Sequence, residues 1–344
     1  MKLHSCGRLN AELSSVTCVA ILLLSGCSSS SINSGSTGTG GSSTPAGTTV
    51  STGAQMGLIW NSSDSTLRTL VGVPGATQIG PALFPAGTFS TGAFASPTQT
   101  ALLIDPKGNL KAMTLPSQQP VTLTGDVSPS SQITFSPHGA YAVIFAPGSS
   151  SLLLVTGIPQ SPAVATVSSA TQIQGAAVSD AGTLLVAANS GATGVTISAT
   201  TASGARTTLA TLAGYGGMSF VPGSEDSLIA DSQANTLARY HNGTPTTLAT
   251  GANGLNQPFA VAASRDDHWA VAADRADGSL LRVDLTGITT PVQSKCTCSP
   301  TQLSALNGNA VFELAPPGAS PGWMIEADSP ESRVLFIPAV RSGQ

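Results

Sequence analysis

Charged and aromatic side chains are scarce in this sequence. Only 9% of its 344 residues are charged and 4% are aromatic, whereas a typical soluble domain is about 25% charged. The formal net charge is −4, with 13 Lys and Arg residues in all. A nucleic-acid-binding surface needs clustered basic residues, so we expect no nucleic-acid partner. Small residues such as Ala, Thr, Ser, Gly and Val take up the difference, which suits closely packed strands.

Helical periodicity is also missing. Outside the first 26 residues, no window of about 11 residues places its apolar side chains at the spacing of an amphipathic helix. Apolar and polar residues instead alternate in short runs, such as 67–70, 110–113 and 280–283. Alternation with a period of two is typical of half-buried strands. The sequence therefore predicts an all-β fold.

A tight turn between two short strands recurs along the chain. The clearest copy is Ser136-Pro137-His138-Gly139, which precedes the apolar run 140–145. Related turns lie at positions 96, 136, 179, 221, 264 and 316, spaced by 40 to 43 residues until a last step of 52. Four short strands in a repeat of this length are the pattern of a β-propeller blade.

A short polar residue ends the apolar strand of nearly every unit. These residues are Asn61, Asp105, Asn189, Asp231, Asp274 and Asp328. The unit that ends near Pro147 lacks such a residue, and counting it gives seven units, each expected to be a blade of four antiparallel strands. Six or eight blades are the alternatives, because terminal units are the hardest to count.

The sequence of the units resembles that of the YVTN-type and NHL-type β-propeller repeats, in which S-P-D-G turns and V-A-D strand ends recur. The resemblance covers about residues 55–340 and implies a propeller domain over residues 53–344. Propellers host unrelated functions, so the resemblance does not choose a ligand.

Ring closure predicts that the two ends of the propeller domain meet, because a closed ring leaves no exposed sheet edge. The last unit shows strands near 310–315, 322–328 and 333–338, and its fourth strand is missing. The stretch Thr48–Ser51 could supply the first strand of the first blade, or an outer strand that completes the last one.

The chain begins with the features of a secretory leader. Lys2 and Arg8 precede a short apolar stretch, 13–24, that is too short to span a bilayer,. It ends in Leu24-Ser25-Gly26-Cys27, which resembles the lipobox of bacterial lipoproteins. The resemblance implies a signal peptide over residues 1–26 and acylation of Cys27. An ordinary secretory signal with an incidental cysteine is the alternative.

Residues 27–52 are rich in Ser, Gly and Thr, a composition that cannot bury apolar surface, so they are expected to form a flexible tether. The lipobox resemblance implies a lipid anchor in the cell envelope, and Ser28 in place of an Asp favours the outer membrane. The membrane is then a partner through the anchor, and we expect a monomer.

The six polar residues at strand ends are candidates for a binding rim. In a propeller, the turns between second and third strands lie on one face, together with the connections between blades. Asn61, Asp105, Asn189, Asp231, Asp274 and Asp328 should therefore ring one mouth of the channel, where they could bind a cation, a sugar or a basic peptide. The alternative is that these Asn and Asp side chains open turns by bonding their own backbone.

Four acids are the weak catalytic candidates: Asp231, Asp274, Glu326 and Asp328. Glu326 and Asp328 lie two apart on one expected strand and so share a face. Paired carboxylates are required for glycosidic-bond hydrolysis, and their oxygens could also bind Ca²⁺. We expect no cofactor, with Ca²⁺ as the alternative, and no metal-ligand set is assigned.

Cys296 and Cys298 lie in the connection between the last two units, 291–309, which is longer than the others. Outside the cytoplasm, two cysteines this close are expected to form a disulfide. Metal binding and redox activity are the alternatives. A four-ligand zinc site would need further ligands.

Two functions follow as hypotheses. The first is a lipid-anchored envelope propeller that binds a protein or glycan partner without catalysis. The second is a propeller hydrolase, a lactonase or a glycan-cleaving enzyme, with a divalent cation at the channel mouth.

Overall fold

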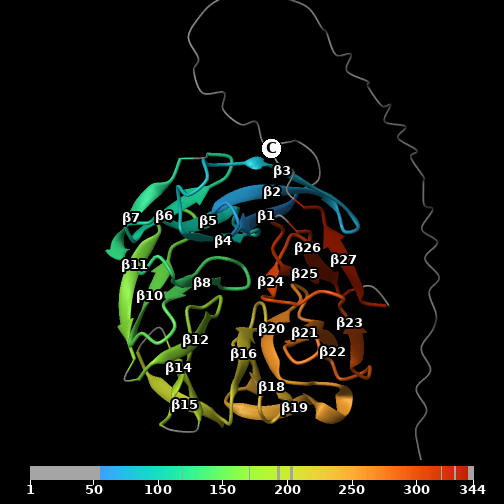
Figure 1. The fold of residues 1–344 in the computed structure, drawn as a ribbon. Coiled ribbons are helices and arrows are strands. Elements are labelled where there is room, and N and C mark those ends of the chain that lie inside the picture. The colour runs from blue at the N-terminus through green and yellow to red at the C-terminus, as the bar shows by residue number, and fades with distance from the viewer. Residues whose placement is uncertain are drawn as a thin grey trace, which may run out of the picture. The chain divides into compact units, whose positions relative to one another are not determined.

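The computed structural model describes residues 55–117, 119–169, 171–191, 194–201, 204–318, 320–328 and 331–339. These residues form seven separate antiparallel sheets around a common centre (Figure 1), so the domain is a seven-bladed β-propeller. The only helical element in these ranges is a 3-10 turn, η1 (Gly251–Asn253). No described segment forms a helix of the length and apolarity that crossing a bilayer requires. The predicted all-β propeller is confirmed.

The first four blades follow one another along the chain. Blade 1 contains β1 (Gln55–Asn61), β2 (Thr66–Val73) and β3 (Ala76–Ala82). Blade 2 contains β4 (Thr91–Ala95), β5 (Thr100–Ile104), β6 (Asn109–Thr114) and β7 (Val121–Asp126). Blade 3 contains β8 (Gln132–Phe135), β9 (Ala142–Phe145), β10 (Ser151–Thr156) and β11 (Ala163–Ser168). Blade 4 contains β12 (Ile173–Val178), β13 (Leu184–Asn189), β14 (Val195–Thr200) and β15 (Arg206–Leu212).

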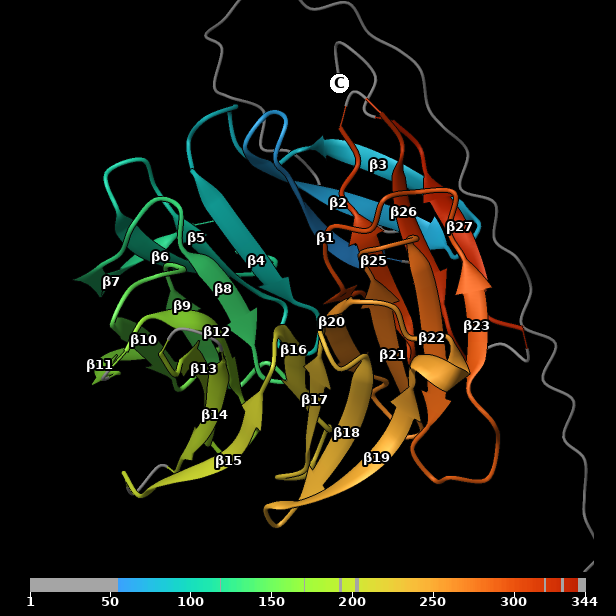
Figure 2. The same cartoon turned by 60° about the horizontal axis from the view of Figure 1, so that its bottom comes forward.

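Three further blades complete the ring. Blade 5 contains β16 (Tyr215–Phe220), β17 (Ser227–Asp231), β18 (Thr236–His241) and β19 (Thr244–Thr250). Blade 6 contains β20 (Pro258–Ala263), β21 (Trp269–Asp274), β22 (Ser279–Asp284) and β23 (Val292–Lys295). Blade 7 contains β24 (Ser304–Ala305), β25 (Val311–Ala315), β26 (Gly322–Glu326) and β27 (Arg333–Ile337). Figure 2 shows the blades from a tilted viewpoint.

The apolar core is divided among the contacts between blades. Seven clusters of buried side chains are present, and each one joins two neighbouring blades. The second strands are the most apolar: β5 is buried along its whole length, as are β9 and β17. A second strand is covered on both faces by adjacent blades, which explains why these runs are continuously apolar rather than alternating.

The ring closes between blades 7 and 1, as the sequence predicts. Leu306 and Met324 of blade 7 share one apolar cluster with Met56 and Ile59 of blade 1. The backbone N–H of Asn307 donates to the Met56 carbonyl at 2.6 Å, and its side-chain amide donates to the Gln55 carbonyl at 2.8 Å. Blade 1 has three strands within the described residues. The stretch Thr48–Ser51, proposed to complete a blade, lies outside them.

The sequence placed the last unit in the wrong register. The sequence predicts a turn between the first and second strands at residues 315–318, but this stretch lies at the end of β25, which is the second strand of its sheet. The true first turn is at Asn307, 43 residues after Ser264, and the repeat therefore keeps its regular step. The missing first strand is β24, which is only two residues long and has no apolar pattern to reveal it.

This correction also removes the long connection that was predicted over residues 291–309. That range contains β23, the turn with the two cysteines, and β24. We call the face at which second strands end the upper face, and the opposite one the lower face. Because strands within a blade are antiparallel, third strands end on the lower face.

Candidate functional site

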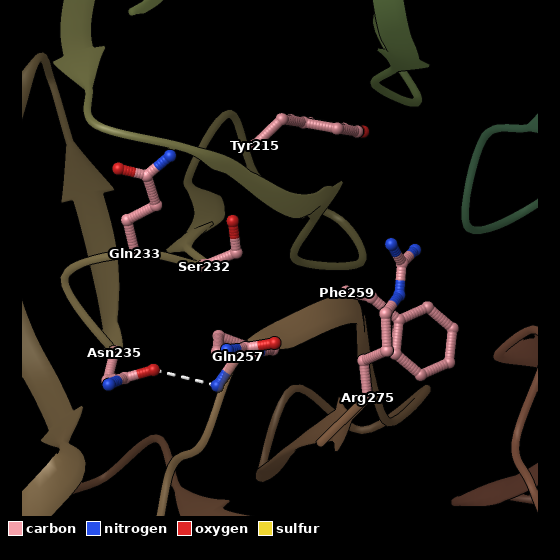
Figure 3. Close-up of a pocket in the computed structure, with 8 residues that line it drawn as sticks. Tyr215, Ser232, Gln233, Asn235, Gln257, Phe259 and Arg275 are labelled. Atoms are coloured by element: carbon pink, nitrogen blue, oxygen red, sulfur yellow. Dashed lines mark hydrogen bonds between the residues drawn. The ribbon is translucent and has the colours of Figure 1, made fainter.

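A pocket of about 390 Å³ opens on the upper face between blades 5 and 6. It is formed by the turn after β17, the start of β16, the start of β20 and the turn after β21. Its lining residues are Tyr215, Ser232, Gln233, Asn235, Gln257, Pro258, Phe259 and Arg275 (Figure 3). The volume lies at the low end of the roughly 300–1,000 Å³ that is usual for small-molecule sites.

Asp231 builds the blade 5 side of this pocket. Its Oδ1 accepts hydrogen bonds from the backbone N–H groups of Gln233 and Ala234, at 3.0 and 2.9 Å. The same carboxylate accepts from Ala213 N at 2.7 Å and Gly214 N at 3.1 Å, in the connection from blade 4. Asp side chains stabilise turns in this way. The result is a fixed turn that presents residues 232–235 to the pocket.

Asp274 holds the corresponding place in blade 6. The residue is completely buried and accepts a hydrogen bond from the Ser279 hydroxyl at 2.9 Å. Burial raises the pKa of its carboxyl to about 6, because an ionised group is poorly solvated there. The next residue, Arg275, is exposed, and its guanidinium lies 5.5 Å from the centre of the Phe259 ring.

Backbone contacts tie the two turns together. The Asn235 side-chain oxygen accepts from Gln257 N at 2.7 Å, and the Gln257 carbonyl accepts from Arg275 N at 3.1 Å. Gln257 has a φ of 57°, in the left-handed region that non-glycine residues seldom occupy. The pocket wall is therefore a hydrogen-bonded unit that spans two blades.

Most of the polar side-chain groups that line the pocket have no hydrogen-bond partner among the residues that the structure describes. Among the described residues, none accepts a hydrogen bond from the Arg275 guanidinium or binds the side-chain amides of Gln233 and Gln257. The same holds for the hydroxyls of Ser232 and Tyr215. In Figure 3 the Tyr215 side chain extends to the right and the Arg275 guanidinium points upward from its turn. These groups are available to a ligand.

Tyr215 reaches across the channel side of the pocket toward blade 4. A Cβ added to Gly175 would lie only 2.1 Å from the Tyr215 hydroxyl oxygen, which is a clash. A glycine is therefore required in β12 for the Tyr215 ring to lie there. Desolvation of the ring hydroxyl raises its pKa above the ordinary value, so Tyr215 is a neutral hydrogen-bonding group at physiological pH.

The other expected rim residues are Asn61 at the end of β1, Asp105 after β5 and Asn189 at the end of β13, and their side chains bond to nearby residues. Asn61 Oδ1 accepts from the backbone N–H and hydroxyl of Ser63, at 3.1 and 2.8 Å. Asp105 accepts from the N–H groups of Lys107 and Asn109, each at 2.9 Å, and the bond from the Asn109 side chain lowers the pKa of its carboxyl. Asn189 pairs with the side chains of Gln172 and Gln174. This geometry is the turn-opening alternative, and a binding role for the rim stays a prediction.

Asp328 does not belong to this rim. It follows β26, the third strand of blade 7, and therefore lies on the lower face. β26 ends at Glu326, so the two acids do not share a strand as expected. The Glu326 carboxylate pairs with Arg333 on the next strand. The misplacement comes from the register error in the last unit.

The four catalytic candidates are consequently divided between two faces. Asp231 and Asp274 lie at the upper face, whereas Glu326 and Asp328 lie at the lower one. The predicted acidic cluster is wrong. Within the described ranges, no group of three or more His, Cys, Asp or Glu side chains is placed to hold a metal ion.

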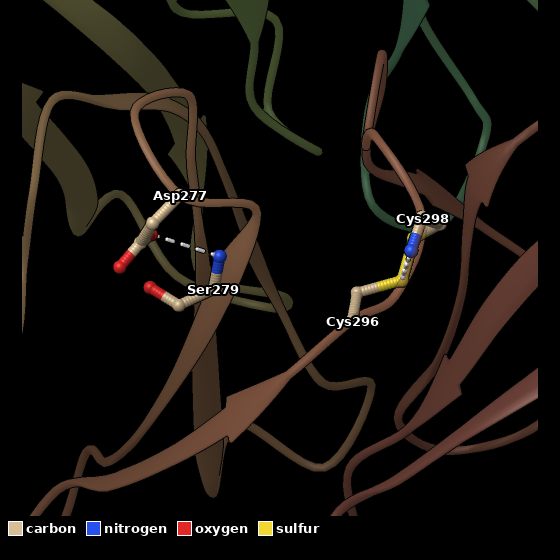
Figure 4. Close-up of a disulfide and its surroundings, with 4 residues drawn as sticks. All are labelled: Asp277, Ser279, Cys296 and Cys298. Carbon is tan, nitrogen blue, oxygen red and sulfur yellow. Dashed lines mark hydrogen bonds between the residues drawn. A yellow bond between two sulfur atoms is a disulfide. The ribbon is translucent and has the colours of Figure 1, made fainter.

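Cys296 and Cys298 are joined by a disulfide in the structure (Figure 4). Their turn packs against the turn after β21, since a Cβ on Gly278 would lie 3.0 Å from the Cys298 carbonyl oxygen. Asp277, in that turn, accepts from Ser279 N at 3.0 Å. Cys296 is also buried in the apolar cluster between blades 6 and 7.

We expect replacement of both cysteines by serine to destabilise the domain by about 1–2 kcal/mol. The closed loop is short, so the entropy it removes from the unfolded chain is small. The measurement is a urea titration of the oxidised protein, the dithiothreitol-treated protein and the double variant. An unchanged midpoint in both altered samples would mean that the pair contributes nothing to stability.

Sequence reasoning missed Tyr215, Phe259 and Arg275. Arg275 could have been found, because it directly follows the predicted rim residue Asp274. Tyr215 and Phe259 start the inner strands β16 and β20, and nothing in the sequence shows that their ends converge with the turns of residues 232–235 and 275.

The sequence matches no protein-family model and no curated protein. The fold is similar to that of a functionally unknown protein from Desulfotomaculum acetoxidans, with a TM-score of 0.57, 11% identity, and coverage of 83% of this chain and 100% of that one. The β-propeller domain of Cps50 (Swd1) from Myceliophteria thermophila gives a TM-score of 0.55, 11% identity, and coverage of 74% and 88%. Virginiamycin B lyase from Staphylococcus aureus gives a TM-score of 0.51 and 12% identity, with coverage of 76% of this chain and 92% of the lyase. At these identities the likeness extends to the fold alone.

Proposed function

We propose that this chain is a lipid-anchored β-propeller of the cell envelope that binds a glycan or protein partner through the pocket between blades 5 and 6. The observation that supports the proposal is the set of polar side chains, at Tyr215, Ser232, Gln233, Gln257 and Arg275, whose hydrogen-bonding groups have no described protein partner. A rigid wall of fixed turns holds these groups, which reduces the entropy lost on binding.

A hydrolase built on Asp231, Asp274, Glu326 and Asp328 is not proposed. The carboxylates that flank a glycosidic bond lie within about 10 Å of each other, and these four divide between opposite faces of the propeller. A propeller can carry an enzyme, as the name of the S. aureus lyase indicates, but fold likeness does not transfer an activity.

A pocket-filling variant tests the binding proposal. The full chain, purified in detergent, is immobilised and exposed to solubilised envelope extract and to a glycan array. Gln233→Trp places a large ring in the pocket from an exposed turn, and we expect it to abolish capture. Glu331→Trp, at an exposed position on the lower face, is the matched control. Capture that survives Gln233→Trp, or no capture by the wild-type protein, would contradict the proposal.

The anchor has its own test. Cys27→Ser removes the proposed acylation site, and we expect the protein to move from the membrane fraction to the soluble fraction. Acyl chains contribute about 0.8 kcal/mol per buried methylene, so the loss of several chains should leave little membrane affinity. Intact-mass measurement of the wild-type protein should show an acylated chain that begins at Cys27. An unmodified N-terminus would rule the anchor out.

A further inference from the structure

The pocket between blades 5 and 6 carries one charged side chain, and that charge is positive. Among the described lining residues, Arg275 is the one with a charged side chain. Among the described residues, no carboxylate forms an ion pair with its guanidinium. A guanidinium presents a planar fork of N–H donors that matches a carboxylate in a bidentate arrangement. An anionic group on the ligand would supply the missing partner.

Phe259 fixes the orientation of this fork. The guanidinium carbon lies 5.5 Å from the ring centre, within the range of a cation–π contact. Figure 3 shows the Arg275 side chain standing beside the Phe259 ring rather than extended away from it. Since Phe259 is only half-buried, a ligand could contact the apolar ring while its anionic group meets the guanidinium.

The neighbouring acids do not compete for Arg275. The Asp231 carboxylate is saturated by four backbone N–H groups, and Asp274 is buried beneath the turn with a bond from Ser279. Asp277 accepts from Ser279 N at 3.0 Å, and the Lys295 charge acts on its carboxylate. Each of these three carboxylates therefore accepts at least one hydrogen bond from a group other than Arg275.

The rest of the lining favours a ligand with many hydroxyl groups. Amide side chains each offer two donors and an acceptor, and Ser and Tyr hydroxyls can donate or accept. Sugar hydroxyls also donate and accept hydrogen bonds, so the several hydroxyls of one sugar ring can bond to several of these side chains at once. The small volume, about 390 Å³, suits one or two sugar units better than a folded protein surface.

We propose that this pocket binds an acidic sugar, with Arg275 bonding the carboxylate and the side chains of Gln233, Gln257, Ser232 and Tyr215 bonding ring hydroxyls. The inference rests on the proposed binding function and specifies its ligand class. Arg275 then decides specificity for acidic over neutral sugars, because only it supplies a charge that complements the carboxylate.

Titration calorimetry on the full chain in detergent tests this proposal. The probes are oligosaccharides of galacturonate, of glucuronate and of N-acetylneuraminate, each paired with its methyl ester, which keeps the ring and removes the charge. We expect at least one acid to bind roughly 10- to 100-fold more tightly than its ester, the range of a charge-assisted bidentate contact.

Arg275→Gln should weaken binding of that acid by a similar factor and change ester binding less than about twofold. Arg275→Lys keeps the charge but loses the fork, so it should recover only part of the affinity. Arg333→Gln makes the same change of charge on the lower face and is the control. The melting temperature of each variant, expected to match the wild type, excludes unfolding as the cause.

The outcomes separate this inference from the proposed function. Capture of neutral glycans or of a protein, with no preference for the acids, overturns the acidic-sugar inference and leaves the binding function standing. Tighter binding of a hexaglutamate peptide than of every acidic sugar overturns it in favour of a peptide. Absence of any binding, to sugars or to envelope extract, defeats both.

Discussion

Replacing Gly217 by alanine is expected to destabilise the propeller by about 3 kcal/mol. Gly217 lies in β16 with a φ of 99°, a backbone conformation that costs other residues roughly 1–2 kcal/mol. A Cβ added there would lie 2.8 Å from the Cα of Ala260 and 3.1 Å from its carbonyl carbon and nitrogen. These atoms belong to the backbone of β20, so blades 5 and 6 would have to move apart, at a further cost of about 1–3 kcal/mol.

Gly223→Ala is the matched control for this substitution. Gly223 also has a positive φ, 66°, and lies in the same blade, but no described atom beyond its two chain neighbours lies within 4 Å of its added Cβ. The control therefore carries the backbone cost without the clash and should lose only about 1 kcal/mol. Urea titrations of both variants measure the difference, and the melting temperature of Gly217→Ala should fall by roughly 5–10 °C.

Equal losses in the two variants would contradict the close approach of β16 and β20. The comparison also bears on the pocket, since Tyr215 begins β16 and Phe259 lies in β20. If Gly217→Ala is tolerated through a small shift of the blades, the ligand site should change shape, and affinity should fall while the control keeps its affinity.

Glu313 is expected to make the stability of the domain decrease with rising pH. It lies in β25 with an exposed fraction of 4%, and its Oε2 accepts a hydrogen bond from the Gln302 side chain at 2.6 Å. Its other carboxyl oxygen is buried without a partner among the described residues. Burial raises the pKa from its ordinary value of 4.5 to about 8, so the carboxyl is protonated in the native protein at neutral pH.

The direction of the effect follows from proton binding. Between pH 4.5 and about 8 the native state holds a proton that the unfolded chain has released, and the free energy of unfolding therefore falls as pH rises. Below this window both states are protonated, and above it both are ionised, so the contribution of Glu313 is constant. The total loss across the window is on the order of 3–5 kcal/mol.

Glu313→Gln tests this expectation. A glutamine keeps the shape and the acceptor for Gln302 but cannot ionise, so the variant should match the wild type near pH 5 and be the more stable protein above pH 8. Glu225→Gln, at an exposed position, is the control. Urea titrations at pH 5, 6, 7, 8 and 9 provide the measurement.

The pH dependence of Glu313→Gln itself provides a second check. Asp274, with a pKa of about 6, should still give a decrease of stability in Glu313→Gln, but that decrease should end near pH 6. A wild-type stability that is flat from pH 5 to pH 9 would mean that Glu313 is ionised throughout or reached by water.

The repeat could be found from the sequence because its turns and strand ends each require particular residue types. Turn formers such as Ser136-Pro137 and strand-ending acids such as Asp231 recur at a nearly constant step, and the continuously apolar second strands mark each blade. The prediction for the last blade is wrong because β24 is only two residues long. Pro316 and Pro317 resemble the turn between first and second strands, but they lie between the second and third strands of that blade.

The pocket could be predicted only in part. Asp231 and Asp274 indicate where the turns lie, since their carboxylates bond to nearby backbone and side-chain groups. Arg275 follows in sequence, but its contact with Phe259 joins the turn after β21 to the strand β20. Among the described residues no carboxylate pairs with Arg275, and this depends on how the surrounding surface packs, which no local pattern records.

By itself, the sequence determined the architecture of this protein: an all-β ring of seven repeats that closes on itself. Period-two alternation and turn chemistry act over a few residues, so they can be read along the chain. Only the tertiary structure decided which strand ends share a face, that Glu326 and Asp328 lie opposite Asp231 and Asp274, and which polar groups remain unpaired between blades 5 and 6. Those facts depend on contacts between residues far apart in sequence, whose geometry is fixed only when the blades pack around the ring.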